Sequence, residues 1–189
     1  HYILIWTLAD KRSAWFRDID NAARYCAECS GDTYMGVGLS ATERGASVRC
    51  PANESAGIAG LWADIDYQDG EAHQGENIPP NIEAAQQVID VIGLKPTMLV
   101  HSGHGLQAWW LLKEPLMFDD PVERKAAASM SLLWQKNIQK KAAQIGYRID
   151  SVHDLARIMR IPGTLNCKGQ EKVEVKVLYS DGPRYVELA

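Results

Sequence analysis

The sequence predicts an α+β fold in which helices pack on a mixed or antiparallel sheet. Segments rich in branched and aromatic residues alternate with helical patterns along the 189 residues. Two of the expected strands flank the tight turn 102–105, which is typical of a β-hairpin. No internal repeat or low-complexity linker interrupts the chain. We therefore expect a single domain over 1–189, with a possible small N-terminal unit over 1–57.

The first half of the chain alternates apolar runs with breaks. We expect strands over 2–7, 33–39 and 58–67, helices over 13–29 and 81–92, and loops over 41–57 and 69–80. Ser30 and Gly31 would end the first helix. Asn81 can cap the second helix, and Gly93 can stop it.

The second half begins with the hairpin over 96–112. A long amphipathic helix over 121–145 follows, without internal Pro or Gly. A short strand over 147–150 and a helical turn over 152–159 come next. Terminal strands are expected over 173–179 and 184–188, with a hairpin between them. Trp109 and Trp110 are adjacent, so one should be in the core, and the other could pack against a helix or stack on a base.

Composition and charge narrow the class of protein. The chain is 46% apolar and 23% charged, which is ordinary for a globular domain. No apolar run reaches the roughly 18 residues that span a bilayer, and no secretory signal is visible. The first residue is not Met and the four cysteines form no dense framework, so we expect a cytoplasmic, monomeric core cut from a longer protein.

The net charge of −4 argues against nonspecific binding along nucleic acid, but the charges are unevenly distributed. Residues 61–94 contain seven acids and no Lys or Arg, whereas 136–189 contain ten Lys or Arg and six acids. One segment could therefore collect cations while another meets phosphates.

Asp64 and Asp66 are the first candidate site. Residues i and i+2 of a strand point to the same face, so the strand would aim both carboxylates at one point. Two carboxylates at one point repel each other unless a cation lies between them, and hard divalent ions take oxygen ligands. The alternative is a strand end that runs into the polar turn 68–70.

His101 and His104 form a second cluster in a glycine-flanked turn, where a ligand can approach the backbone closely. A surface turn with a chance histidine is the alternative.

The segment 149–168 is the third cluster. It combines cationic side chains with a Gly/Thr/Asn turn, an anion cradle suited to a triphosphate. Its candidate binding residues are Arg157, Arg160, Gly163, Thr164, Asn166 and Lys168. The alternative there is a plain Asp154–Arg157 salt bridge beside a Pro-Gly turn.

Together the three clusters fit the two-metal plan for attack of a sugar hydroxyl on a nucleoside triphosphate. The chain resembles the catalytic core of the archaeo-eukaryotic primase superfamily. Three motifs occur in the order typical of that family: Asp64-Ile-Asp66, Ser102-Gly-His104 and Ile149-Asp150. The segment 157–168, Arg-Ile-Met-Arg-Ile-Pro-Gly-Thr-Leu-Asn-Cys-Lys, is similar to primase-polymerases of plasmids, prophages and CRISPR-associated systems.

The resemblance implies an RNA-recognition-motif-like antiparallel sheet that carries the site, with an α/β N-terminal unit. Asp64, Asp66 and Asp150 would bind two Mg²⁺ or Mn²⁺ ions, with Asp154 as a rival for the third acid. Ser102 and His104 would contact the incoming triphosphate, and Arg160 and Lys168 would be further phosphate contacts.

The resemblance also implies partners, namely a DNA template and primer together with dNTPs or NTPs. Related proteins carry a helical priming domain after the core, and we expect it to be absent from this sequence, so primer extension is the activity to expect.

Zinc is not expected at Cys26-Ala-Glu-Cys29, because a structural zinc site needs four ligands and only Cys50 is a nearby third. The alternatives are a rolling-circle or relaxase-like metal-dependent nuclease, and a catalytically silent nucleotide-binding module.

Overall fold

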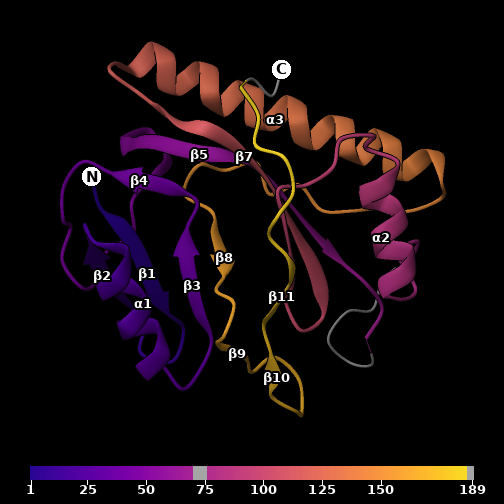
Figure 1. Cartoon of the computed structure of the whole chain (residues 1–189), viewed down its shortest axis with the longest axis horizontal. Coiled ribbons are helices and arrows are strands. Elements are labelled where there is room, and N and C mark those ends of the chain that lie inside the picture. The colour runs from indigo at the N-terminus through magenta and orange to yellow at the C-terminus, as the bar shows by residue number, and fades with distance from the viewer. Residues whose placement is uncertain (70–75, 187–189) are drawn as a thin grey trace.

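The computed structural model describes residues 1–69 and 76–186 as an α+β fold built on antiparallel sheets (Figure 1). The helices are α1 (Ile19–Glu28), α2 (Ile82–Asp90), α3 (Pro121–Gln144) and the 3₁₀ turn η1 (Ala52–Glu54). The strands are β1 (Ile3–Thr7), β2 (Arg12–Phe16), β3 (Thr33–Gly36), β4 (Gly38–Ser40), β5 (Ser55–Asp66), β6 (Met98–His101), β7 (Gly105–Met117), β8 (Ile158–Arg160), β9 (Leu165–Asn166), β10 (Val173–Glu174) and β11 (Lys176–Tyr179). None of the described helices is long and apolar enough to cross a membrane.

The larger sheet has five strands in the order β11-β6-β7-β5-β4, and each neighbouring pair is antiparallel. The hairpin expected over 96–112 is confirmed as β6 and β7. Helices α2 and α3 cover one face, where Ala63 and Ile65 of β5 pack with Val88 of α2 and Ile138 of α3. Because side chains alternate along a strand, Asp64 and Asp66 face the opposite side of the sheet.

A smaller sheet with the order β2-β1-β3-β8 lies beside the larger one, on the left of Figure 1. Helix α1 packs on one of its faces, where Ile5 meets Ala22 and Cys26. Strand β8 comes from residues 158–160 and pairs with β3, so the predicted N-terminal unit over 1–57 shares its sheet with the C-terminal third. The chain passes between the two sheets at Val37, whose N–H donates to the Arg157 carbonyl.

Several predicted elements differ from the structure. The predicted helix over 13–29 is wrong in its first part, because residues 12–16 form β2 and pair in register with β1. The helix begins only after Asp18, whose side chain caps it by accepting from the Asp20 N–H at 2.8 Å. The predicted strand over 33–39 is two strands, which belong to different sheets.

The segment 147–157 does not form the predicted strand, and the helical turn predicted over 152–159 is reduced to a single turn, in which the Arg157 N–H donates to the Asp154 carbonyl at 2.9 Å. Tertiary hydrogen bonds replace regular structure there: Trp62 Nε1 donates to the Val152 carbonyl at 2.7 Å, and Ser131 Oγ donates to the His153 carbonyl at 2.9 Å. The predicted C-terminal hairpin is also wrong, because β11 pairs with β6 and Tyr185 bridges Leu112 in parallel. Residues 70–75 of the predicted loop 69–80, and residues 187–188 of the last predicted strand, lie outside the described residues.

Candidate active site

Asp64 and Asp66 lie at the end of β5, opposite Gln107 and Gly105 of β7. Burial raises the pKa of Asp66 to about 7, and the charges of Asp64 and Asp150 add to this rise, whereas the charges of Lys168 and Arg157 oppose it. All four of these side chains therefore lie within electrostatic range of Asp66. Three predicted acids and two predicted cations therefore interact electrostatically at Asp66, although they come from β5 and from three positions in the segment 149–168.

Gly105 permits the close approach of β7 to Asp66. A Cβ at this position would lie 2.8 Å from Asp66 Oδ1 and 2.9 Å from the Ile65 carbonyl oxygen. Such contacts cannot persist without movement of the backbone or the carboxylate. Gly105, which the sequence predicted to flank a ligand-binding turn, therefore also leaves the space that the Asp66 side chain occupies.

The Gly105→Ala substitution is expected to lower the free energy of unfolding by about 1–3 kcal/mol and to reduce activity, because the new methyl group displaces Asp66. Urea unfolding measures the first effect. Gly31→Ala is the matched control, because a Cβ there would meet no atom within 4 Å. Equal stability of the two variants would contradict this account of Gly105.

His104 is held from both sides. Its Nδ1 pairs with the Asp69 carboxylate, and its Nε2 lies 2.8 Å from the Lys168 carbonyl oxygen. Both ring nitrogens of His104 are therefore in contact with oxygen atoms of the protein itself. Asp69 was missed by the sequence analysis, where it appeared only as a turn residue. The one feature of the sequence that could have indicated a role for Asp69 was its position in the acidic run after Asp66.

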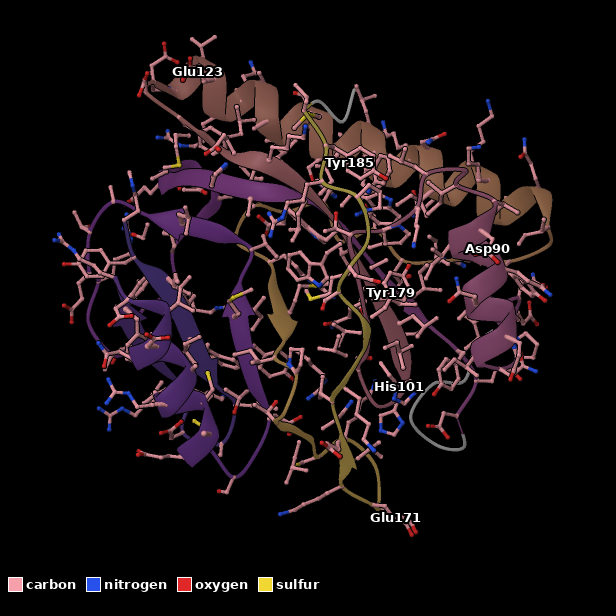
Figure 2. All side chains as sticks on the ribbon, in the orientation of Figure 1. Asp90, His101, Glu123, Glu171, Tyr179 and Tyr185 are labelled. Atoms are coloured by element: carbon pink, nitrogen blue, oxygen red, sulfur yellow. The ribbon has the colours of Figure 1, made fainter. Side chains whose placement is uncertain are left out.

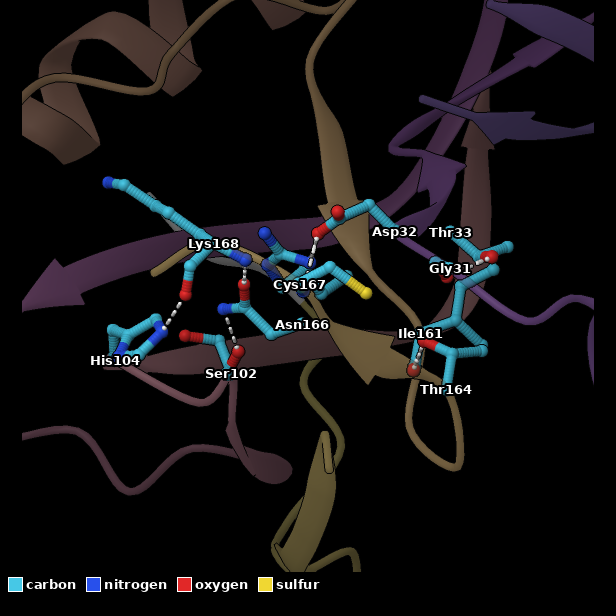
Figure 3. Close-up of polar contacts among 11 residues, drawn as sticks. Gly31, Asp32, Thr33, Ser102, His104, Ile161, Thr164, Asn166, Cys167 and Lys168 are labelled. Carbon is cyan, nitrogen blue, oxygen red and sulfur yellow. Dashed lines mark hydrogen bonds and ion pairs between the residues drawn. The ribbon is translucent and has the colours of Figure 1, made fainter. Parts of the chain in front are cut away.

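The turn that carries His104 is hydrogen-bonded to β9 and to the residues that follow it (Figure 3). Asn166 Nδ2 donates to the Ser102 carbonyl at 2.7 Å, and the Lys168 N–H donates to Asn166 Oδ1 at 3.0 Å. The Ser102 hydroxyl donates to the Gly105 carbonyl at 3.1 Å. Ser102 is 5% exposed and Asn166 is 2% exposed. These two side chains thus form a frame that positions Lys168 beside His104.

Arg160 and Thr164 also have internal partners. Arg160 Nη1 forms an ion pair with Asp32 Oδ1 at 2.5 Å, and the same oxygen accepts from the Cys167 N–H at 3.1 Å (Figure 3). The Thr164 hydroxyl donates to the Ile161 carbonyl at 2.7 Å. Asp32 is therefore another residue that the sequence analysis missed, and it ties the β8–β9 segment to the smaller sheet.

Arg157 differs from Arg160 because its partner is one of the acids. Its Nη2 lies 3.3 Å from Asp64 Oδ2, and its side chain is 40% exposed. Asp154 instead accepts from the Ala156 N–H at 2.8 Å, so it caps a turn, and the alternative Asp154–Arg157 salt bridge does not form among the described residues. Asp150 is exposed and directly follows buried Ile149.

Metal-ligand chemistry is present only in part. Within residues 1–69 and 76–186, no three His, Cys, Asp or Glu side chains are grouped so that they could hold a metal ion by themselves. The Asp64/Asp66 pair fits a divalent cation in its oxygen chemistry and in the raised pKa of Asp66, and further ligands would have to come from substrate or water. Cys26 packs against Ile5, and burial raises its pKa to about 11, so it remains a neutral thiol.

Two further features are a tyrosine–histidine pair, whose tyrosine directly follows Asp66, and a cavity under α3. The Tyr67 hydroxyl lies 2.7 Å from His101 Nε2, and burial lowers the pKa of His101 (Figure 2 labels His101). A cavity of about 1070 Å³ lies beneath α3, between Leu133, Leu94 and Tyr185. It is lined by none of the predicted site residues, so its size does not make it the candidate active site.

Comparisons with known proteins give one informative likeness. No protein-family model and no curated protein matches the sequence. A solved structure of the AEP domain of the primase-polymerase of cyanophage S-2L is similar, with a TM-score of 0.56 and 13% sequence identity. The likeness covers 97% of this chain and 82% of that one. At this identity it shows a shared fold.

Proposed function

We propose that this chain is the catalytic core of a DNA primase-polymerase, a template-directed nucleotidyltransferase that joins nucleoside triphosphates to a 3′-hydroxyl. One observation carries the proposal: the charges of Asp64, Asp150, Arg157 and Lys168 all act on Asp66, and Arg157 Nη2 lies 3.3 Å from Asp64 Oδ2. Carboxylates suit divalent ions, and adjacent cations suit the phosphates of a nucleotide. The similarity in fold to a cyanophage primase-polymerase domain supports the same class. The part of the chain order that runs β5-α2-β6-β7-α3 fits the expected RNA-recognition-motif-like sheet, whereas β8, β9 and β10 come before β11, which pairs with β6.

The residues divide into four groups by their contacts. Asp64, Asp66 and Asp150 would hold two Mg²⁺ or Mn²⁺ ions, which when bound supply an activated 3′-hydroxyl and a neutralised pyrophosphate. His104 and Lys168 would stabilise the charge that develops on the triphosphate. Arg157 now lies beside Asp64, and its exposure lets it turn to a phosphate. Ser102 and Asn166 are buried and act through the frame that they build. Arg160 and Thr164 are held by their partners Asp32 and Ile161.

The activity is tested by extension of a labelled primer on a DNA template, with Mg²⁺ and then Mn²⁺, and with dNTPs and then NTPs. We expect incorporation that depends on the template and on the metal ion. Failure with both metals and both nucleotides, by protein that is folded, would contradict the proposal. A strand nick without nucleotide would favour the nuclease alternative, and nucleotide binding without turnover would favour the silent module.

Asp150 is preferred to Asp154 as the third acid. Asp150 adds to the rise in the pKa of Asp66, whereas Asp154 caps the turn at Ala156. Asp150→Asn is expected to lower incorporation about 100-fold or more at unchanged stability, because Asp150 is exposed and its charge serves the reaction.

Asp154→Asn is the matched control, since it makes the same chemical change four residues away. It should stay within about threefold of wild type, because an Asn side chain can also cap a turn. The rates are compared on the same primed template, and equal losses in the two variants would contradict the assignment.

A further inference from the structure

Aromatic and guanidinium side chains form a row across the face of the smaller sheet that α1 leaves uncovered. Trp6 of β1 lies directly opposite Tyr34 of β3, and Tyr34 lies directly opposite Arg160 of β8. Residues that lie directly opposite each other in a sheet share a face. Ile5 points to the other face, where it packs against Cys26 of α1. The row therefore lies on the face opposite α1, and it crosses three strands.

The side chains of the row stack on one another. The rings of Trp6 and Tyr34 have their centroids 5.7 Å apart at 50°, and the Arg160 guanidinium lies 4.8 Å from the centroid of Tyr34. Arg49, from the loop that follows β4, lies 5.4 Å from the centroid of Trp6. The order is thus Arg49, Trp6, Tyr34, Arg160, with a cation at each end and half-buried aromatic rings between them.

The two ends of the row differ. Arg160 is fixed by its buried ion pair with Asp32. Arg49 is exposed, and among the described residues it forms no ion pair, so its contact with the indole of Trp6 is one that another flat group could replace. An exposed guanidinium without a carboxylate partner is also available to a phosphate.

The inner end of the row is connected to the candidate active site through Asp32, which pairs with Arg160 and accepts from the N–H of Cys167, the residue before Lys168. Burial raises the pKa of the Tyr34 hydroxyl, the charge of Arg160 opposes this rise, and the charges of Asp32 and Asp64 add to it. Asp64 is therefore within electrostatic range of Tyr34. The row leads from the acids outward along the surface of the smaller sheet.

We propose that Trp6, Tyr34 and Arg49 form a binding surface for single-stranded nucleic acid beside the active site. A base stacks on the face of Trp6 that Arg49 now covers, and the Arg49 guanidinium pairs with the adjoining phosphate. Aromatic side chains interspersed with cations bind unpaired bases in this way, because every base offers a π-face and every nucleotide a negative charge. A duplex keeps its base faces stacked internally, so the surface selects a single strand. That this strand is the template rests on the proposed function.

The test is fluorescence anisotropy with a labelled single-stranded DNA oligonucleotide, without nucleotide or metal. Trp6→Ala is expected to weaken binding about tenfold, because one stacked base is lost. Trp6→Phe keeps an aromatic face and should stay within about threefold. Arg49→Ala should reduce the slope of log affinity against log salt by about 0.7, the value for one phosphate contact on a single strand. Lys140→Ala, an exposed cation of α3, is the control and should leave the slope unchanged.

The outcomes separate the surface from the proposed function. Trp6→Ala binding equal to wild type, or equal competition by blunt duplex DNA, would overturn the surface even if primer extension succeeds. Loss of binding in Trp6→Ala without any primer extension by wild type would support the surface and contradict the polymerase. If Trp6→Ala fails to fold, the salt dependence of binding by Arg49→Ala tests the surface instead, because the Arg49 side chain is exposed and its removal should not disturb folding. An unchanged slope would then overturn the proposal.

Discussion

Replacing Asp66 with Asn is expected to abolish nucleotide incorporation and, in metal-free buffer, to stabilise the protein above pH 7. Burial and the neighbouring Asp64 raise the pKa of Asp66 to about 7 in the folded protein, from an ordinary value of 3.8. Between these values the folded state binds more protons than the unfolded state, so stability falls as the pH rises from about 4 to 7. Asn keeps the shape without the charge, which removes a penalty on the order of 2 to 4 kcal/mol.

Urea unfolding of wild type and Asp66→Asn at pH 5 and pH 8 measures this effect. Wild type should lose stability between the two pH values, and the variant should lose clearly less. Asp181→Asn, which removes an exposed carboxylate, is the control and should follow wild type. A variant that is less stable than wild type at pH 8 would contradict the raised pKa. A stable variant that still extends primers would contradict the role of Asp66 in the reaction.

Replacing Asp32 with Ala is expected to cost about 3–5 kcal/mol in the free energy of unfolding, because it leaves the Arg160 charge buried without a partner. The two side chains are 12% and 10% exposed, and the Cys167 N–H loses its acceptor as well. For a chain of this size, thermal unfolding should shift downward by roughly 10 °C. The double variant Asp32→Leu with Arg160→Met should recover much of the loss, because it leaves no unpaired buried charge.

A surface pair provides the contrast. Lys176 and Glu174 lie 3.2 Å apart with side chains 60% and 55% exposed, so Lys176→Ala should cost less than about 1 kcal/mol. A similarly small loss for Asp32→Ala would contradict the buried pair. The double variant also tests the predicted phosphate contact of Arg160. If it is stable and extends primers normally, Arg160 serves only to stabilise the fold through its pair with Asp32. If it is stable but inactive, Arg160 reaches the nucleotide.

Local patterns in the sequence predicted the parts of the fold that depend on near neighbours. The period of two in β5 placed Asp64 and Asp66 on one face, and the turn chemistry of 102–105 identified the β6–β7 hairpin. Asn81 caps α2 as expected, since its Oδ1 accepts from the Ala84 N–H at 2.9 Å. In each case the deciding residues are within a few positions of each other, so the pattern is visible in the chain itself.

Local patterns failed where a distant partner decides the structure. Residues 12–16 fit a helix as well as a strand, and only pairing with β1 makes them β2. The segment 147–157 gives up regular structure because buried side chains such as Trp62 and Ser131 hydrogen-bond its backbone. Propensity is a weak determinant, and tertiary contacts override it at such places.

The sequence by itself determined which chemistry is available here: carboxylates on one strand face, a histidine in a glycine-flanked turn, and a cationic segment near the C-terminus. Only the tertiary structure decided which of these side chains meet. It placed Asp150 within range of Asp66, paired His104 with Asp69, and joined Arg160 to Asp32, a residue 128 positions away. The physical reason is that charge and hydrogen bonding act through space over a few ångströms, whereas sequence patterns report only neighbours along the chain.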